Sequence, residues 1–388
     1  MSRTHHSAPT VSPLGELSIN EFLRDYWQKK PLLVKQAFPD FPVTLSPDEL
    51  AGFSLDSDCQ ARIVEQHSDS DWRVKHGPFS ETAFSSLPES HWSLLVQNID
   101  AMDEEVNELL QAFRFLPNWR IDDVMASYAT LGGGVGPHFD YYDVFLIQGM
   151  GKRRWRIGQY CDASTALIPN QDMKLLQHFE CSEDWLVETG DLLYIPAQIA
   201  HWGESLDNSL TYSIGFRSPS FSELLLDCTH HLNQHLEEDQ RYRDGNEIKQ
   251  YMDPGRIPEM AIQELRRTLI ELVDKPEVIA DWIGEYATQL RPQAQPELLP
   301  LDFASVDDWH AGKTLSLSSF NRAVYIEREN TCHCYINGNR IPFSVETAKK
   351  LCEYRAFNKA ELPQSDAETI AVLISEANIF VLHQQQTD

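Results

Sequence analysis

The stretch from Ile121 to Arg217 restricts the fold more than any other part of this 388-residue chain. It contains six short runs rich in β-branched and aromatic residues, with Gly, Pro and Asn between them: DVMASYAT, YDVFLIQG, KRRWRIG, DWLVE, GDLLYIP and SLTYSIGF. Many short strands separated by frequent turns are typical of a barrel or a sandwich. The sequence therefore predicts a β-rich central domain.

The residues before this domain are predicted to be mostly helical. Residues 1–20 are expected to be disordered, and NEFLRDYWQKKPLLVKQAF predicts a helix that leads into a short strand. In LSPDELAGF, Ser46 suits the cap of a helix and Pro47 its first position. A further helix is expected in IDAMDEEVNELLQAF, where the apolar residues fall on one face: Met102, Val106, Leu109, Leu110 and Phe113.

The pattern becomes helical again after Ser218. Ser220 and Glu223 form a candidate capping box, and an apolar stripe follows: Phe221, Leu224, Leu225, Cys228, Leu232 and Leu236. The helical segment 219–291 is too thin to form an independent core. Because helices with apolar faces and little else to pack on often dimerise, a dimer through these helices is expected. RPQAQPELLP is a predicted linker, and residues 301–388 predict a small winged-helix-like module with a type I′ hairpin turn at Asn337-Gly338.

Composition excludes several classes of protein. The chain has no apolar run of about 18 residues, which a membrane-spanning helix needs, and its first residues, MSRTHHSAPTVSPLGEL, lack the apolar core of a secretion signal. Seven dispersed cysteines suit the reducing cytoplasm better than a disulfide framework. A formal net charge of −27 disfavours direct nucleic acid binding and favours basic partners.

His138 and Asp140 follow a glycine-rich segment, GGGVGP, and precede an apolar run. On a strand these two residues would project from the same face. A third ligand is offered by His201, which follows the predicted strand 192–195 and Pro196. Two histidines and one carboxylate form the facial triad that binds Fe(II) and leaves coordination positions open. Those positions would accept a 2-oxoacid and dioxygen.

The remaining histidines and cysteines are weaker metal-ligand candidates. His230, His231 and His235 are expected on a solvated helix face or a dimer seam, and His178 on the surface. Cys332 and Cys334 would share one strand face with His333 on the other, and no second cysteine pair follows with zinc spacing. We expect both cysteines to face the core.

Three segments of the central domain, taken together, resemble the JmjC-type 2-oxoglutarate oxygenases: GGGVGPHFDYYDVFLIQGMGKRRWRIG, GDLLYIPAQIAHWGES and SLTYSIGFRSPS. More narrowly they resemble the bacterial ribosomal oxygenases, and DYWQKKPLLVKQAF extends the resemblance over nearly the whole chain. The resemblance implies an α+β fold. It places a double-stranded β-helix (cupin/JmjC) catalytic domain in 21–218, a helical dimerisation region in 219–291 and a winged-helix-like domain in 301–388, in a cytoplasmic homodimer.

The same resemblance implies roles for individual residues. His138, Asp140 and His201 would bind Fe(II), and Arg153 would bind the distal carboxylate of the cosubstrate 2-oxoglutarate, for which its planar guanidinium is suited. Strand alternation places Arg153 and Trp155 on one face. Ser127, or alternatively Thr130, would donate a hydroxyl to that carboxylate. Weaker candidates for the other end of the cosubstrate are Asn208 and Ser213.

The implied reaction inserts one atom of O2 into a side chain of a large-subunit ribosomal protein, most simply an arginine. Tyr141, Tyr142 and Asp143 are the expected substrate contacts, because a guanidinium favours carboxylates and aromatic faces. A histidyl hydroxylase or a demethylase would share the iron site. A cupin metalloenzyme without 2-oxoglutarate would not need Arg153, and a non-catalytic binding protein would need no metal ligands.

Overall fold

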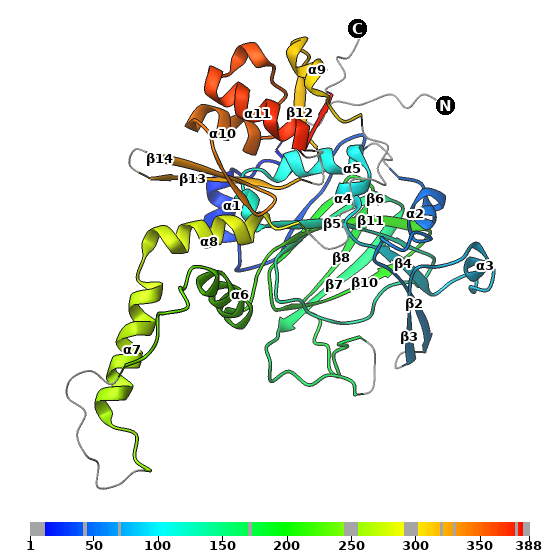
Figure 1. The fold of residues 1–388 in the computed structure, drawn as a ribbon. Helices are drawn as coiled ribbons and strands as arrows, with labels where there is room; N and C mark the ends of the chain where they lie inside the picture. The colour runs from blue at the N-terminus through cyan, green and yellow to red at the C-terminus, as the bar shows by residue number, and fades with distance from the viewer. Residues whose placement is uncertain are drawn as a thin grey trace. The chain divides into compact units, whose positions relative to one another are not determined.

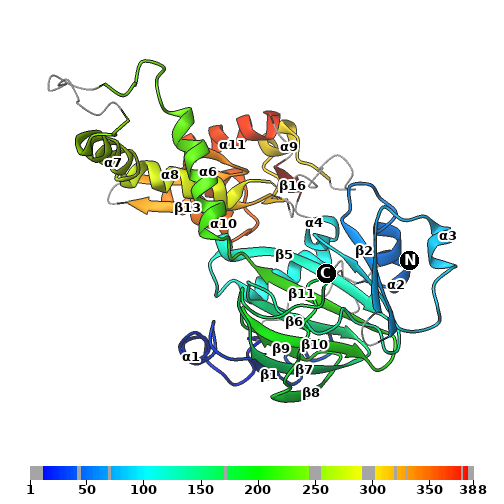
Figure 2. The same ribbon diagram turned by 90° about the horizontal axis from the view of Figure 1, so that it is seen from below.

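The computed structural model describes residues 12–41, 45–68, 71–169, 173–243, 255–290, 302–318, 321–328, 331–376 and 379–382. These residues form two compact units (Figures 1 and 2), and the boundary between them follows Ser218. The first unit holds the central domain and the second holds the later helices and the C-terminal module. The predicted linker 291–300 lies outside the described residues.

The first unit is built on two antiparallel sheets. The larger has eight strands in the order β1-β9-β6-β11-β5-β4-β2-β3, and the smaller has the order β10-β7-β8. The strands are β1 (Leu32–Val34), β2 (Ala61–Ser68), β3 (Asp71–His76), β4 (Trp92–Val96), β5 (Ile121–Ala129), β6 (Val144–Met150), β7 (Lys152–Tyr160), β8 (Glu183–Glu188), β9 (Leu192–Ile195), β10 (Ile199–Ser205) and β11 (Ser209–Phe216). This arrangement is the predicted double-stranded β-helix.

Each of the six predicted strand runs contains a strand, β5 to β9 and β11. Alternation is clearest in β7, where Arg153 and Trp155 are each 5% exposed while Lys152 and Arg154 face solvent. Lys152 pairs with Glu188 and Arg154 with Asp184 on the surface. The predicted division of this strand into a buried and an exposed face is therefore confirmed.

Short helices cover the outer face of the larger sheet. They are α1 (Ile19–Asp25), α2 (Pro47–Phe53), α3 (Glu81–Phe84), α4 (Ile99–Met102), α5 (Glu104–Leu109) and the 3-10 turns η1 (Leu110–Phe113) and η2 (Asn118–Arg120). Ser46 caps α2 and Pro47 begins it, as predicted. The single helix expected after Ile99 is interrupted at Asp103, which caps α5 with its side chain.

One expectation for the first unit is wrong, and two of its strands lie where no element was predicted. Residues 12–20 are ordered, because Leu14 is 2% exposed within the main core and Ser18 caps α1 with a capping box; residues 1–11 lie outside the described part. Strands β2 and β3 fall in a region for which the sequence predicted no structure. Together with β4 they extend the larger sheet beyond β5.

The second unit begins with α6 (Phe221–Gln234), α7 (Glu259–Val273) and α8 (Pro276–Thr288). Its C-terminal part has the order of a winged helix: α9 (Val306–His310), β12 (Leu315–Leu317), β13 (Ala323–Arg328), β14 (Thr331–Ile336), β15 (Asn339–Pro342), α10 (Val345–Cys352), η5 (Lys359–Glu361), α11 (Gln364–Glu376) and β16 (Phe380–Leu382). Asn337 and Gly338 both have positive φ, as a type I′ turn requires. In the described part of the chain, no helix is long and apolar enough to cross a membrane.

Side chains of the second unit agree with the predictions in all but one case. The predicted capping box of Ser220 and Glu223 begins α6. Cys334 is buried in the core and Cys332 packs against it, while His333 contacts Asp281 of α8 on the other face. The expectation for His231 is wrong, because this residue is 6% exposed and its Nδ1 lies 3.0 Å from Glu285 of α8.

Candidate metal centre and active site

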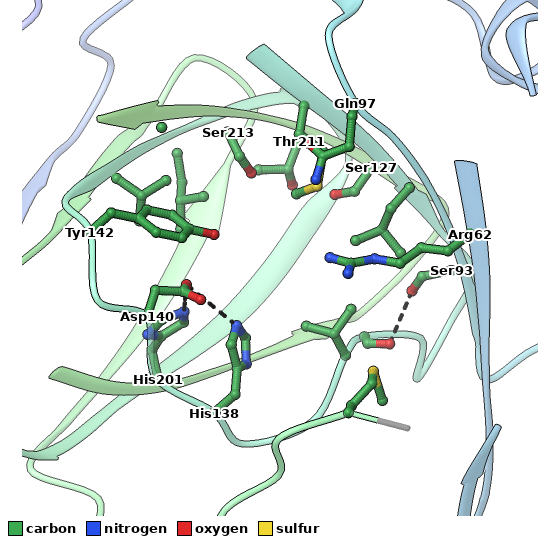
Figure 3. Close-up of a pocket in the computed structure, with 18 of the residues that line it drawn as sticks. Arg62, Ser93, Gln97, Ser127, His138, Asp140, Tyr142, His201, Thr211 and Ser213 are labelled. Carbon is green, nitrogen blue, oxygen red and sulfur yellow. Dashed lines mark hydrogen bonds and ion pairs between the residues drawn. The ribbon is translucent and has the colours of Figure 1, made fainter. Parts of the chain in front are cut away.

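His138, Asp140 and His201 meet at one point of the first unit. Their candidate ligand atoms all lie within 4.8 Å of one another. Nε2 of His138 is 3.8 Å and Nε2 of His201 is 3.6 Å from Oδ2 of Asp140 (Figure 3). Two imidazoles and one carboxylate on one side of a common point form the donor set of a facial triad.

The backbone holds His138 and His201 in register. The main-chain N–H of each donates to the carbonyl of the other, at 3.0 and 2.8 Å. His201 lies in β10, but His138 belongs to an isolated bridge in the loop before β6. The strand expected at His138 is therefore reduced to one bridge, which still directs His138 and Asp140 to the same side.

Each imidazole is fixed in the tautomer that a metal requires. Nδ1 of His138 lies 2.9 Å from the carbonyl of Gly136, and Nδ1 of His201 lies 2.9 Å from the carbonyl of Ile199. A carbonyl only accepts hydrogen bonds, so each Nδ1 carries the proton and each Nε2 keeps its lone pair. Burial, with His138 nearby, lowers the pKa of His201 to about 4, which keeps it neutral.

The glycines before His138 allow the backbone to approach β10. Gly134 forms a bridge with Glu204, and a Cβ at Gly134 would lie 2.3 Å from the carbonyl oxygen of Gly203. Gly136 has a φ of +75°, a backbone conformation that residues with a side chain rarely adopt. The glycine-rich segment therefore brings His138 to His201.

The three candidate ligands line a cavity of about 570 Å³ between the two sheets. Arg153, Trp155 and His201 come from the smaller sheet. The facing wall consists of alternate residues of the larger sheet, with Gln97 directly after β4; the sheet residues include Arg62, Leu95, Met125, Ser127, Leu146, Thr211 and Ser213. Polar side chains thus cover a large part of this wall (Figure 3).

Arg153 has the features of an anion-binding residue. Its Nε donates to Oγ of Ser209 at 3.0 Å, but its Nη2 is buried without a hydrogen-bond partner among the described residues. Burial lowers the pKa of Arg153 to about 10. A buried guanidinium donor without a partner favours an acceptor from outside the chain, and a carboxylate is the best match to its geometry.

The other residues expected to bind the cosubstrate divide into two groups. Ser127 and Ser213 line the cavity. Thr130 does not line it, since its hydroxyl hydrogen-bonds to the main chain of Trp92, and Asn208 is exposed between β10 and β11. The structure therefore contradicts a direct role for Thr130 or Asn208. Thr211, which the sequence did not single out, lies beside Ser127 on the neighbouring strand.

Of the three expected substrate contacts, Tyr142 alone lines the cavity. Its ring is partly exposed, but its hydroxyl points inward (Figure 3). Burial, Asp140 and Asp123 raise its pKa, while Arg62 acts in the opposite direction. Tyr141 does not line the cavity. It is 49% exposed, and its ring packs on the ring of Phe139.

The expectation that Asp143 contacts substrate is wrong. Asp143 is fully buried and accepts hydrogen bonds from Tyr194 at 2.6 Å and Gln28 at 3.1 Å. Arg120 lies 3.7 Å from the same carboxylate. Asp143 therefore does not face the cavity. Its contacts with these three partners hold the loop before β6 in place.

Sequence reasoning missed the cavity residues contributed by β2, by the end of β4 with the residue after it, and by the start of β5. Arg62, Gln97, Asp123 and Met125 all line the cavity. Their alternation with apolar residues was the available signal, since Arg62 lies between the buried Ala61 and Ile63. The same alternation also fits an ordinary strand with one solvated face.

Comparison with known proteins agrees with the fold. A family model described as JmjC domain matches residues 108–224, and one described as ROXA-like winged helix matches residues 268–375. A ribosomal protein uL16 3-hydroxylase of Escherichia coli (strain K12) is 39% identical over 287 residues, which cover 73% of this chain and 76% of that protein. A probable ribosomal oxygenase of Haemophilus influenzae is 46% identical over 205 residues, or 53% of this chain and 50% of that protein.

Solved structures give the same result. The X-ray structure of E. coli ycfD superposes with a TM-score of 0.82 at 33% sequence identity, covering 95% of this chain and 99% of that one. The YcfD ribosomal oxygenase in complex with cobalt and 2-oxoglutarate superposes with a TM-score of 0.80 at 32% identity, over 95% and 99% of the two chains. Fold and site together define a JmjC-type protein with a C-terminal winged helix. The chain belongs to the ribosomal oxygenase family.

Proposed function

We propose that this protein is an Fe(II)- and 2-oxoglutarate-dependent hydroxylase of a large-subunit ribosomal protein, and that the hydroxylated residue is an arginine. The observation that carries the proposal is one cavity that holds both the three candidate metal ligands and the unpartnered guanidinium of Arg153. The uL16 hydroxylase similarity supports the substrate class. A ribosomal substrate places the reaction in the cytoplasm.

Bound Fe(II) and 2-oxoglutarate would supply the oxidation chemistry, in which O2 delivers one oxygen atom to a C–H bond and the other to succinate. The chain's own residues bind and orient. His138, Asp140 and His201 would hold the metal from one side, and Arg153 with Ser127 would hold the distal carboxylate. The apolar lining, including Leu95, Leu146 and Trp155, would exclude water.

Arginine is the proposed target because of the groups that surround the Tyr142 hydroxyl. Asp123 lines the cavity, where its Oδ2 accepts a hydrogen bond from the Asn98 main chain at 3.2 Å. A guanidinium could pair with the Asp123 carboxylate and stack on the Tyr142 ring, while Met125 contacts its aliphatic stem. A neutral imidazole would gain less from a nearby carboxylate than a guanidinium, which carries a charge and several donors. The net charge of −27 favours approach of a basic ribosomal protein.

The 2-oxoglutarate-independent cupin alternative is less consistent with the cavity. Such an enzyme would offer no acceptor for Nη2 of Arg153, and a buried donor left without an acceptor is destabilising. A binding protein without catalysis would equally leave the facial triad unexplained.

Incubation of the purified protein with Fe(II), 2-oxoglutarate and uL16 from the same organism tests the proposal. We expect the intact mass of uL16 to rise by the mass of one oxygen atom, and fragmentation to locate that oxygen on an arginine. Oxygen on a histidine would contradict the choice of residue. If no ribosomal protein gained oxygen while 2-oxoglutarate was supplied, the hydroxylase proposal would be wrong.

We also propose a homodimer formed through α6 and α7. Apolar side chains on these helices are unusually exposed, with Phe221 at 91%, Leu226 at 70%, Leu225 at 67% and Leu269 at 65%. A monomer rarely leaves so large an apolar surface in water. A second copy presents the same surface, and this self-complementarity is typical of two-fold dimers.

Charge substitution on α6 tests the dimer. Leu225→Glu with Leu226→Glu is expected to convert a dimer into a monomer in sedimentation experiments, because a carboxylate cannot be buried in the apolar interface without a partner. Glu237→Lys, an exposed change beyond α6, serves as the control. A wild-type monomer at micromolar concentration would contradict the proposal.

The expected lack of nucleic acid binding stays a prediction.

A further inference from the structure

Arg62 is a charged cavity residue that the proposed reaction does not use. It lies on β2, outside the strands that carry the metal ligands and Arg153, and its guanidinium points into the cavity (Figure 3). It makes no hydrogen bond or ion pair with any residue that the structure describes. A strand residue with five unused donors facing a cavity indicates a partner from outside the chain.

The cosubstrate does not supply that partner. One carboxylate of 2-oxoglutarate would bind the metal, and the other has the buried donors of Arg153. Arg62 is only partly buried, and it comes from the extension of the sheet beyond β5. A segment of the protein substrate, which must enter this cavity to reach the metal, is the other source of such a group.

The chemistry of this group is that of a hydrogen-bond acceptor. The fixed positive charge of Arg62 repels the cationic side chain of an arginine substrate, so the target side chain itself is not the partner of Arg62. Gln97 projects into the cavity directly after β4 (Figure 3), the strand that pairs with β2. Its carboxamide both donates and accepts, as a peptide group does.

We propose that Arg62, with Gln97, binds the main chain of the substrate segment next to the hydroxylated residue and thereby positions the target side chain at the metal. This inference rests on the proposed function. Arg62 donates to main-chain carbonyl oxygens and Gln97 pairs with the adjoining peptide group. Main-chain recognition holds the segment whatever its neighbouring side chains are.

The test measures binding without turnover. Anaerobic calorimetry with Fe(II) and 2-oxoglutarate present gives the Kd of uL16 from the same organism, and a separate titration gives the Kd of 2-oxoglutarate. We expect Arg62→Ala to weaken uL16 binding about tenfold, as expected for one charge-assisted hydrogen bond. Arg62→Lys should recover part of the loss. The Kd of 2-oxoglutarate should not change in either variant, which also shows that the site is folded.

Arg73→Ala is the matched control, since Arg73 is an exposed arginine on the adjacent strand β3 and does not line the cavity. Unchanged uL16 binding in Arg62→Ala would overturn the assignment. Weaker 2-oxoglutarate binding in that variant would also overturn it, because Arg62 would then belong to the cosubstrate site. Wild-type protein that fails to bind uL16 would instead contradict the proposed substrate, and this assignment with it.

Discussion

Replacement of His138 by Ala is expected to abolish the conversion of 2-oxoglutarate to succinate. His138 supplies one of the three candidate ligand atoms that lie within 4.8 Å of one another, and its Nδ1 is already engaged with Gly136. Loss of a group that only orients a ligand typically weakens metal binding by about 10- to 100-fold, so loss of the ligand itself should exceed about 100-fold. Succinate formation and the Kd for Fe(II) measure the two effects.

His178→Ala is the control for this experiment, because His178 is exposed and does not line the cavity. It should keep both metal binding and turnover. Turnover retained by His138→Ala at the wild-type rate would show that the metal is bound elsewhere, and the assignment of the facial triad would be wrong.

Replacement of Arg153 by Ala is expected to raise the KM for 2-oxoglutarate by more than about 100-fold. Two hydrogen bonds between a guanidinium and a carboxylate contribute roughly 3–5 kcal/mol together, and about 1.4 kcal/mol corresponds to a factor of ten. Arg153→Lys should keep the charge but lose the bidentate geometry, so we expect an intermediate KM. Steady-state kinetics at saturating Fe(II) measures these values.

Arg154→Ala provides a control of the same residue type one position along β7. Arg154 faces solvent and pairs with Asp184, so the KM for 2-oxoglutarate should stay the same. Iron affinity should be similar in both Arg153 variants, because Arg153 is not a ligand. An unchanged KM in Arg153→Ala would contradict the assignment of Arg153 to the distal carboxylate of 2-oxoglutarate.

Much of the fold follows from patterns that span only a few residues. The helix cap at Ser46, the capping box at Ser220, the alternation along β7 and the Asn337-Gly338 turn were all predicted, and the structure confirms them. Each depends on contacts between residues close in sequence. The prediction that His138 and Asp140 lie close together also depends on residues close in sequence. It holds even though the strand expected there is a single bridge.

The predictions that failed concern residues whose partners are distant in sequence. Asp143 follows two aromatic residues at the site, but its carboxylate accepts hydrogen bonds from Gln28 and Tyr194, which are 115 and 51 residues away. No local pattern indicates such pairing. His231 was expected on an exposed face for the same reason, since its partner Glu285 lies on another helix.

The sequence by itself determined the strand-rich domain, the three candidate metal ligands and the arginine on the buried face of β7. Only the tertiary structure decided which other side chains share their cavity. Arg62 reaches it because β2 pairs with β4, and β4 with β5, so that residues 62, 95 and 127 lie in one row across the sheet. Alternation in a strand gives two faces, but the order of strands determines which face lines a site, and that order depends on contacts between distant segments.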